Sequence, residues 1–132
     1  FLAFLYGLAP VRDQSAYSGI RDSIHVERAI ALMQDSIEGS LSLKVLAERL
    51  SISPEHLSRV FAARMHLPPM KYFSRLKIEA AMAMLSSTDF RVGEIADKLG
   101  YGSQFHFSRA FSRVAGCSPS EYRQLRLDAK RR

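Results

Sequence analysis

Two serine–arginine pairs stand at matching places in the sequence, Ser58-Arg59 and Ser108-Arg109. Each pair lies in a segment whose apolar residues recur at spacings of three and four, which predicts an amphipathic helix. At 100° per residue, Arg59 lies about 200° around its helix from the apolar Leu57, and Arg109 has the same relation to Phe107. Arginine is the commonest reader of guanine in double-stranded DNA, through paired hydrogen bonds to O6 and N7. The two positions therefore favour base recognition, and a solvated surface arginine is the alternative.

The side chains around these arginines supply further candidate contacts to DNA. Phe105 is unusual for a solvent-facing position, and the methyl group of thymine is a plausible apolar partner for it. The candidates for base contact are His56, Ser58, Arg59, Gln104, Phe105, His106, Ser108 and Arg109. The candidates for phosphate contact are Ser53, Lys71, Arg75, Arg91, Ser103 and Arg113. For the flanking residues, simple proximity to DNA is the alternative to a base contact.

The arginines belong to a longer internal repeat. Residues 46–50 (LAERL) match residues 95–99 (IADKL), then one extra residue enters the second copy, and residues 53–61 match residues 103–111. Each copy predicts a short helix, a tight turn and a second helix, which is the pattern of a helix-turn-helix. We expect two such units, at about 43–66 and 92–116. A solenoid would show similar apolar periodicity, but solenoids need about three or more stacked repeats.

Other site chemistry finds no support in the sequence. The four histidines share no metal-ligand spacing with one another or with Cys117, the one cysteine, so we expect no metal site. The chain has no nucleophile elbow, no recognisable catalytic triad and no glycine-rich phosphate loop. We therefore expect neither an enzyme nor a bound cofactor.

The charge of the chain points to a polyanionic partner. The formal net charge is +6, and the whole excess falls in residues 25–132. A positive excess of this kind favours nucleic acid, although a basic solvated surface without a partner would have the same composition. No apolar run is long enough to span a bilayer, so no membrane association is expected.

The elements that must position these residues are all predicted to be helical, about seven in number, so the fold class is all-α. Ser42 and Ser53 are favoured N-caps, and Ser118 with Glu121 forms a capping box for the last helix. A long helix is expected over about Pro69–Leu85. Residues 1–10 are predicted to form an apolar helix ended by Gly7 and Pro10, with a polar linker over residues 11–23. This linker divides the chain into residues 1–24 and the helical residues 25–132.

Two stretches carry a family resemblance: residues 103–111 (SQFHFSRAF) and residues 116–123 (GCSPSEYR). They resemble the signature of the AraC/XylS-type transcription factors, and the resemblance covers residues 25–132. It implies two helix-turn-helix units joined by a linking helix, each with a recognition helix for the major groove of operator DNA. It also implies a bacterial, cytoplasmic regulator that contacts RNA polymerase, senses a small-molecule effector through an upstream domain, and can form a homodimer at full length. On this resemblance, residues 1–24 are the C-terminal helix and linker of that upstream sensory or dimerisation domain, and residues 25–132 are the DNA-binding domain. The alternative is a helical protein-interaction module with a basic surface.

The chain departs from the family pattern in its first unit. His66 stands where the second copy has Gly116, at a position that favours a left-handed backbone. Glu55 stands where the second copy has Phe105. An acid that faces phosphate is unfavourable, so we expect Glu55 to serve the helix N-terminus or to accept from a cytosine amine.

Overall fold

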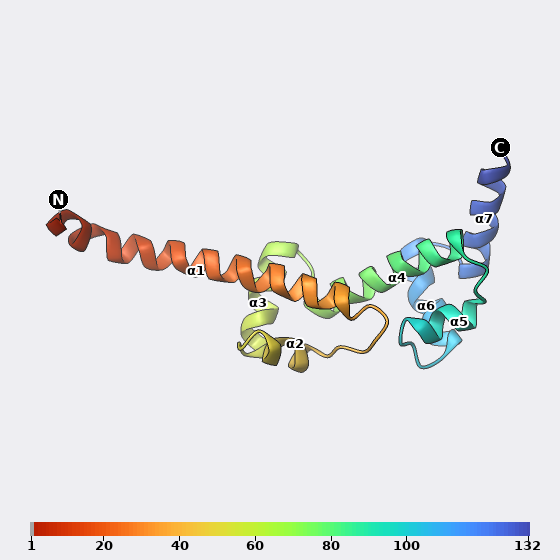
Figure 1. Ribbon diagram of the computed structural model, residues 1–132, viewed down its shortest axis with the longest axis horizontal. Coiled ribbons are helices and arrows are strands. Elements are labelled where there is room, and N and C mark those ends of the chain that lie inside the picture. The colour runs from red at the N-terminus through yellow and green to blue at the C-terminus, as the bar shows by residue number, and fades with distance from the viewer. Residues whose placement is uncertain (1) are drawn as a thin grey trace.

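The computed structural model describes the backbone of residues 2–132 and the side chains from residue 16 onward. This part of the chain forms seven α-helices and no strand (Figure 1). They are α1 (Leu2–Asp35), α2 (Leu43–Arg49), α3 (Pro54–Met65), α4 (Pro69–Ser87), α5 (Val92–Lys98), α6 (Gln104–Ala115) and α7 (Pro119–Arg131). The all-α class with about seven helices is confirmed. None of the described helices is long and apolar enough to cross a membrane.

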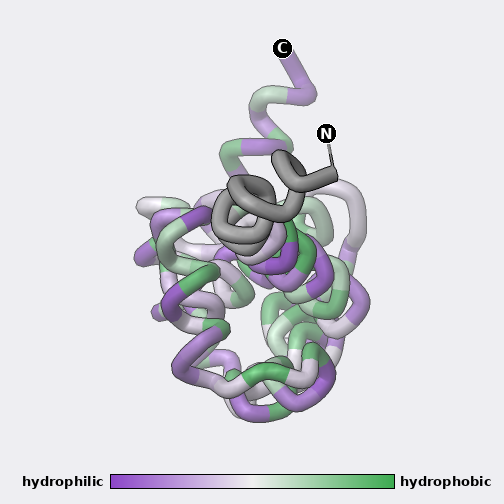
Figure 2. Tube along the Cα trace, turned by 90° about the vertical axis from the view of Figure 1, so that its left-hand side faces the viewer, coloured by the Kyte–Doolittle hydropathy of each residue, from purple (hydrophilic) through white to green (hydrophobic). Residues whose placement is uncertain are grey.

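The helices form two halves that share α4. Helices α1–α3 lie around the start of α4, and helices α5–α7 lie around its end (Figure 1). The first half is built around fully buried Leu57 and Phe61 of α3, and the second around the equivalent Phe107 and Phe111 of α6. Hydropathy alternates along the helices between apolar and polar segments, as expected for helices buried on one side (Figure 2). Each half therefore has its own small core.

The two helix-turn-helix units follow one design, as the repeat predicts. Ala47 and Ala96 are fully buried where the paired helices meet. After each first helix the chain turns through a left-handed residue, Ser51 with φ 58° and Gly100 with φ 77°. The next residue then donates its backbone N–H back to the buried alanine, over 3.1 Å in the first unit and 2.9 Å in the second. The extra residue of the second copy lies after this turn, so it does not disturb the pairing of the helices.

The recognition helices begin and end at the predicted residues. Ser53 and Ser103 cap α3 and α6, each accepting a backbone hydrogen bond over 3.1 Å. At the other end His66 and Gly116 both adopt the left-handed conformation, with φ of 60° and 80°. The expected left-handed position in the first unit is therefore confirmed, and a histidine occupies it. The predicted capping box of Ser118 is also present, which fixes the start of α7.

One local expectation is wrong. Helix α1 continues through Gly7, Pro10 and Gly19, so the expected stop and linker over residues 11–23 are absent. An internal proline removes one hydrogen bond, but each residue added to an existing helix gains one, and helix growth is cooperative. The division at residue 24 stays a prediction, and Phe1 lies outside the described residues.

Candidate nucleic-acid interface

The outward face of α6 gathers the strongest candidates. Phe105, Ser108, Arg109, Ser112 and Arg113 line one open hollow on this helix. Phe105 is 65% exposed. The guanidinium carbon of Arg109 lies 5.5 Å from the centroid of the Phe105 ring, so the aromatic face supports the charged group. Because Phe107 and Phe111 anchor the opposite face in the core, the hollow is presented on a rigid helix.

The two remaining candidates on α6 flank this hollow. Gln104 begins the helix, and its side chain packs against α5: a Cβ added to Gly93 would lie 3.0 Å from the Gln104 amide oxygen. His106 is exposed, and its ring lies edge-on to that of Phe105, with the centroids 6.1 Å apart. Because Gly93 has no side chain, the amide group of Gln104 can lie against the backbone of α5.

On α3 the equivalent arginine is held in a different way. Arg59 is exposed, and its Nη2 donates a hydrogen bond of 2.8 Å to Nδ1 of His56. Nε2 of His56 in turn lies 3.5 Å from the Oδ1 oxygen of Asp22 on α1. In this arrangement Nδ1 accepts from Arg59, and Nε2 faces the carboxylate. Asp22, His56 and Arg59 therefore form a chain of polar contacts from α1 to the recognition helix.

Asp22 belongs to this site although the sequence did not predict it. Its signal was the helical spacing that places Asp22 one turn before the buried Val26, but that signal disappears when residues 11–23 are assigned to a linker. The ring of His25 lies edge-on to that of His56, with the centroids 6.3 Å apart. His56 is a candidate for base contact, but Nδ1 already has Arg59 as a partner and Nε2 already faces Asp22.

The faces of α3 and α6 match position by position but differ in chemistry. The positions equivalent to Phe105, Ser108 and Arg109 are Glu55, Ser58 and Arg59. Arg59 has no aromatic ring beneath it, since Glu55 replaces Phe105. Glu55 is exposed in the first turn of α3, where a carboxylate interacts favourably with the helix dipole.

Three of the phosphate candidates come together between the two units. Lys71 and Arg75 of α4 and Arg113 of α6 line one hollow, together with Leu67, Ala110 and other residues. All three cations are exposed, and among the described residues none of them is paired with a carboxylate. Arg113 also lines the hollow on α6, so the two hollows adjoin at this residue. We call the three residues Lys71, Arg75 and Arg113 the basic bridge.

The other phosphate candidates lie apart from the basic bridge. Ser53 and Ser103 accept a backbone hydrogen bond with their side-chain oxygens, which leaves each hydroxyl free to donate. Arg91 is exposed at the start of α5, where its backbone N–H donates to Glu94. These three residues line neither hollow.

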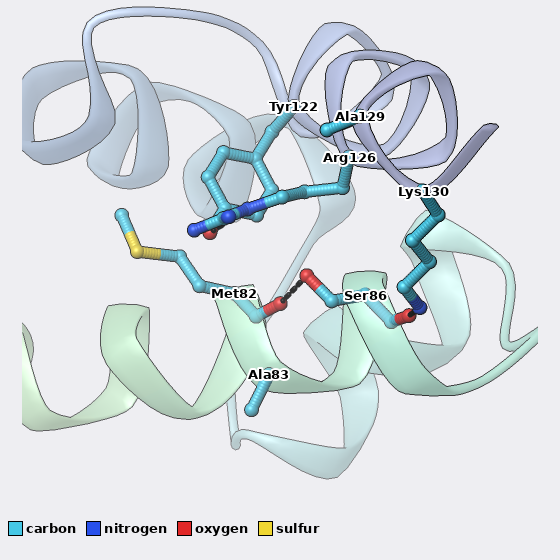
Figure 3. Close-up of a pocket in the computed structure, with 7 residues that line it drawn as sticks. All are labelled: Met82, Ala83, Ser86, Tyr122, Arg126, Ala129 and Lys130. Atoms are coloured by element: carbon cyan, nitrogen blue, oxygen red, sulfur yellow. Dashed lines mark hydrogen bonds between the residues drawn. The ribbon is translucent and has the colours of Figure 1, made fainter. Parts of the chain in front are cut away.

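Two cations of α7 contact the end of α4. Arg123 donates to the carbonyl oxygens of Leu85 and Thr88, over 3.1 and 3.2 Å, and Lys130 donates to that of Ser86 over 2.6 Å. Figure 3 shows the hollow between the two helices, with Arg126 against the ring of Tyr122. These contacts satisfy carbonyls that the helix end leaves without partners. Their role is to hold α7 in place.

The described residues contain no group of three His, Cys, Asp or Glu side chains that could hold a metal ion. Cys117 is a half-buried free thiol. The surface that the structure assembles is thus cationic and aromatic, which suits a polyanion with flat bases.

Comparison with known proteins places the chain in a class of DNA-binding folds. Residues 46–125 match the family described as "Helix-turn-helix domain". The fold resembles that of the C-terminal domain of AraT, a response regulator from Geobacillus stearothermophilus, with a TM-score of 0.75 and 34% identity over 77% of this chain and 85% of that one. It also resembles an AraC-type transcriptional regulator from Chromobacterium violaceum, with a TM-score of 0.75 and 28% identity over 79% and 93% of the two chains. The class is therefore that of helix-turn-helix proteins.

The chain belongs to the AraC-type helix-turn-helix family of transcription regulators. In sequence it is 35% identical over 102 residues to the MmsAB operon regulatory protein of Pseudomonas aeruginosa. The match covers 77% of this chain and 33% of that relative, so the chain spans about a third of the relative's length.

Proposed function

We propose that this chain binds double-stranded DNA at specific sequences and regulates transcription, with α3 and α6 in two successive segments of the major groove. One observation carries the proposal. Two equivalent helices each present an arginine outward, and the surface between them carries the basic bridge. Specific recognition of DNA combines such base-reading side chains with phosphate contacts that fix their register.

Helix α6 is the stronger reader in this proposal. Arg109 donates two hydrogen bonds to a guanine, and Phe105 beside it contacts a thymine methyl group. Ser108, Gln104 and His106 contribute at the edges of the same segment. The stacking of Arg109 on Phe105 supports this role, because it holds the guanidinium on the exposed face before DNA arrives.

Helix α3 reads the second segment with Arg59 and Ser58. His56 acts by holding Arg59, since its two nitrogens already face Arg59 and Asp22. Glu55 either accepts from a cytosine amine or stabilises the start of α3. The first unit therefore contributes fewer direct base contacts than the second.

The phosphate contacts come from the basic bridge, which faces the DNA backbone between the two segments, and from Ser53, Ser103 and Arg91 nearer the helix ends. The linking helix α4 has 19 residues and is therefore about 28 Å long. Successive major-groove segments on one face of straight DNA recur about every 34 Å. We therefore expect the DNA to bend toward the protein, at a cost of about 1–6 kcal/mol that the second set of contacts offsets.

The remaining proposed partners belong to the full-length protein. An upstream domain would sense the small-molecule effector and could form a homodimer, and RNA polymerase would be contacted by the DNA-bound regulator in the cytoplasm. The support for these partners is the family alone.

A salt titration separates DNA binding from the alternative of a basic protein-interaction module. The logarithm of the binding constant for a random duplex should fall linearly with the logarithm of the salt concentration. The slope should be about −2.7 if only the basic bridge neutralises phosphates. This corresponds to a loss of about 40-fold between 50 and 200 mM salt. No binding to the duplex at 50 mM salt would contradict the proposed function.

A further inference from the structure

Lys77 of α4 is the one buried polar or charged residue in the described part of the chain, with 8% of its surface exposed. Its Nζ donates a hydrogen bond of 2.6 Å to the carbonyl oxygen of Gly39 and another to that of Leu99. Gly39 belongs to the connection between α1 and α2, and Leu99 is the residue that ends α5. A single ammonium group thus joins the two halves of the molecule.

Aromatic rings from both halves surround the same group. The Nζ atom lies 4.9 Å from the centroid of Phe73, which packs in the core of the first half, and 5.8 Å from that of Tyr101, which packs on the core of the second. Cation–π attraction strengthens when the cation is desolvated. Burial lowers the pKa of Lys77, because it penalises the charged form.

The backbones of the two halves approach each other closely beside this lysine. Gly100 has φ of 77°, and a Cβ added to it would lie 2.8 Å from the carbonyl oxygen of Gly39 and 3.2 Å from Nζ of Lys77. A side chain at position 100 would therefore force the halves apart at the point where Lys77 joins them. The principal helix contacts otherwise lie within one half or involve α4 itself.

From this geometry we propose that Lys77 is a latch that fixes the orientation of the two helix-turn-helix units, and so determines which spacing between the two DNA segments the protein accepts. The proposal rests on the proposed function, because the spacing matters only if both units read DNA. Lys77 is a positioning residue: it touches no DNA, and it acts through the placement of α3 and α6. The alternative is a lysine that stabilises the fold without affecting spacing.

The test is a panel of duplexes in which the two recognised blocks are moved apart or together by one and two base pairs. Each added base pair rotates one block relative to the other by about 35°. The unaltered chain should prefer one spacing by about tenfold or more, since one misplaced arginine contact is worth that much. Lys77→Met, which keeps the length of the side chain and removes its donors, should flatten this preference to within about threefold, and it should leave binding to a single α6 block unchanged.

Lys71→Met is the matched control on the same helix. Lys71 belongs to the basic bridge, so its loss should weaken binding at every spacing alike. If the Lys77→Met chain folds and keeps the spacing preference of the unaltered protein, the proposed role of Lys77 is overturned. Failure of the unaltered protein to bind any duplex would overturn the proposed function instead.

A measurement without DNA tests the latch separately. Spin labels at Glu48 and Asp97, which occupy equivalent exposed positions on α2 and α5, report the distance between the units after Cys117→Ser removes the native thiol. We expect a narrow distribution in the unaltered background and a broad one with Lys77→Met; equal widths would overturn the latch. Should Lys77→Met fail to fold, Gly100→Ala perturbs the same contact and should broaden the distribution or shift it, and an unchanged distribution would again overturn the latch.

Discussion

Removal of Arg109 should damage recognition of the preferred sequence far more than binding to DNA in general. The guanidinium is exposed and supported by Phe105, and it makes no salt bridge among the described residues that would need to be broken on binding. A bidentate contact to guanine is worth about 1–3 kcal/mol. Arg109→Ala should therefore weaken binding to the preferred duplex by about 5- to 150-fold. On random DNA the same change removes only one positive charge near phosphate, so the loss of affinity should be smaller.

The assay is a fluorescence-anisotropy titration of both duplexes at one fixed salt concentration. A scan of single base pairs in the preferred duplex should show that Arg109→Ala has lost its discrimination at one position. Arg28→Ala removes an exposed arginine from α1, on the other half of the molecule, and controls for the loss of one positive charge. If Arg109→Ala loses equal affinity for preferred and random duplexes, the base-reading role is refuted. Arg59→Ala should show the same behaviour at a position about one helical turn away.

Four further predictions concern the rest of the surface. Alanine at Lys71, Arg75 or Arg113 should weaken binding to all sequences alike and make the salt slope shallower by about one unit each; a sequence-dependent loss would contradict the phosphate role. His56→Ala should weaken binding to the preferred duplex in the unaltered chain but not in the Arg59→Ala background, and additive losses in this double-mutant cycle would show that His56 acts independently of Arg59. Circularly permuted fragments carrying the preferred site should migrate differently when bound, whereas identical migration with a footprint over two major-groove segments would show straight DNA. His66→Gly should relieve the left-handed strain at φ 60° and raise stability by up to about 1 kcal/mol, measured as a higher thermal midpoint, and a lower midpoint would contradict that reasoning.

The local elements of the fold were predictable because their signals are local. The serines at positions 53, 103 and 118 mark helix starts through a hydrogen bond to a residue three positions away. The apolar spacing around Phe61 and Phe111 indicates which side of each helix is buried. The repeat then fixes the pairing of helices within each unit. The outward arginines follow from the same helical geometry.

The contacts that couple distant parts of the chain could not be predicted in this way. Lys77 lies on an amphipathic helix, where a lysine is usually solvated, and its partners are 38 and 22 residues away in the sequence. The pairing of Asp22 with His56 likewise depends on an unbroken α1, which Gly19 and Pro10 argue against locally. Such contacts depend on the tertiary arrangement of the halves, about which single-helix periodicity carries no information.

The most direct test of the central claim is a selection of bound sequences from random double-stranded DNA with this chain. Two recognition helices held by one linking helix predict two enriched blocks, whose centres lie about one helical turn apart, 10–10.5 base pairs on straight DNA. We expect the Arg59→Ala chain to lose enrichment in one block and the Arg109→Ala chain to lose it in the other. Recovery of DNA with no enriched sequence, or loss of the same block in both variants, would contradict the central claim.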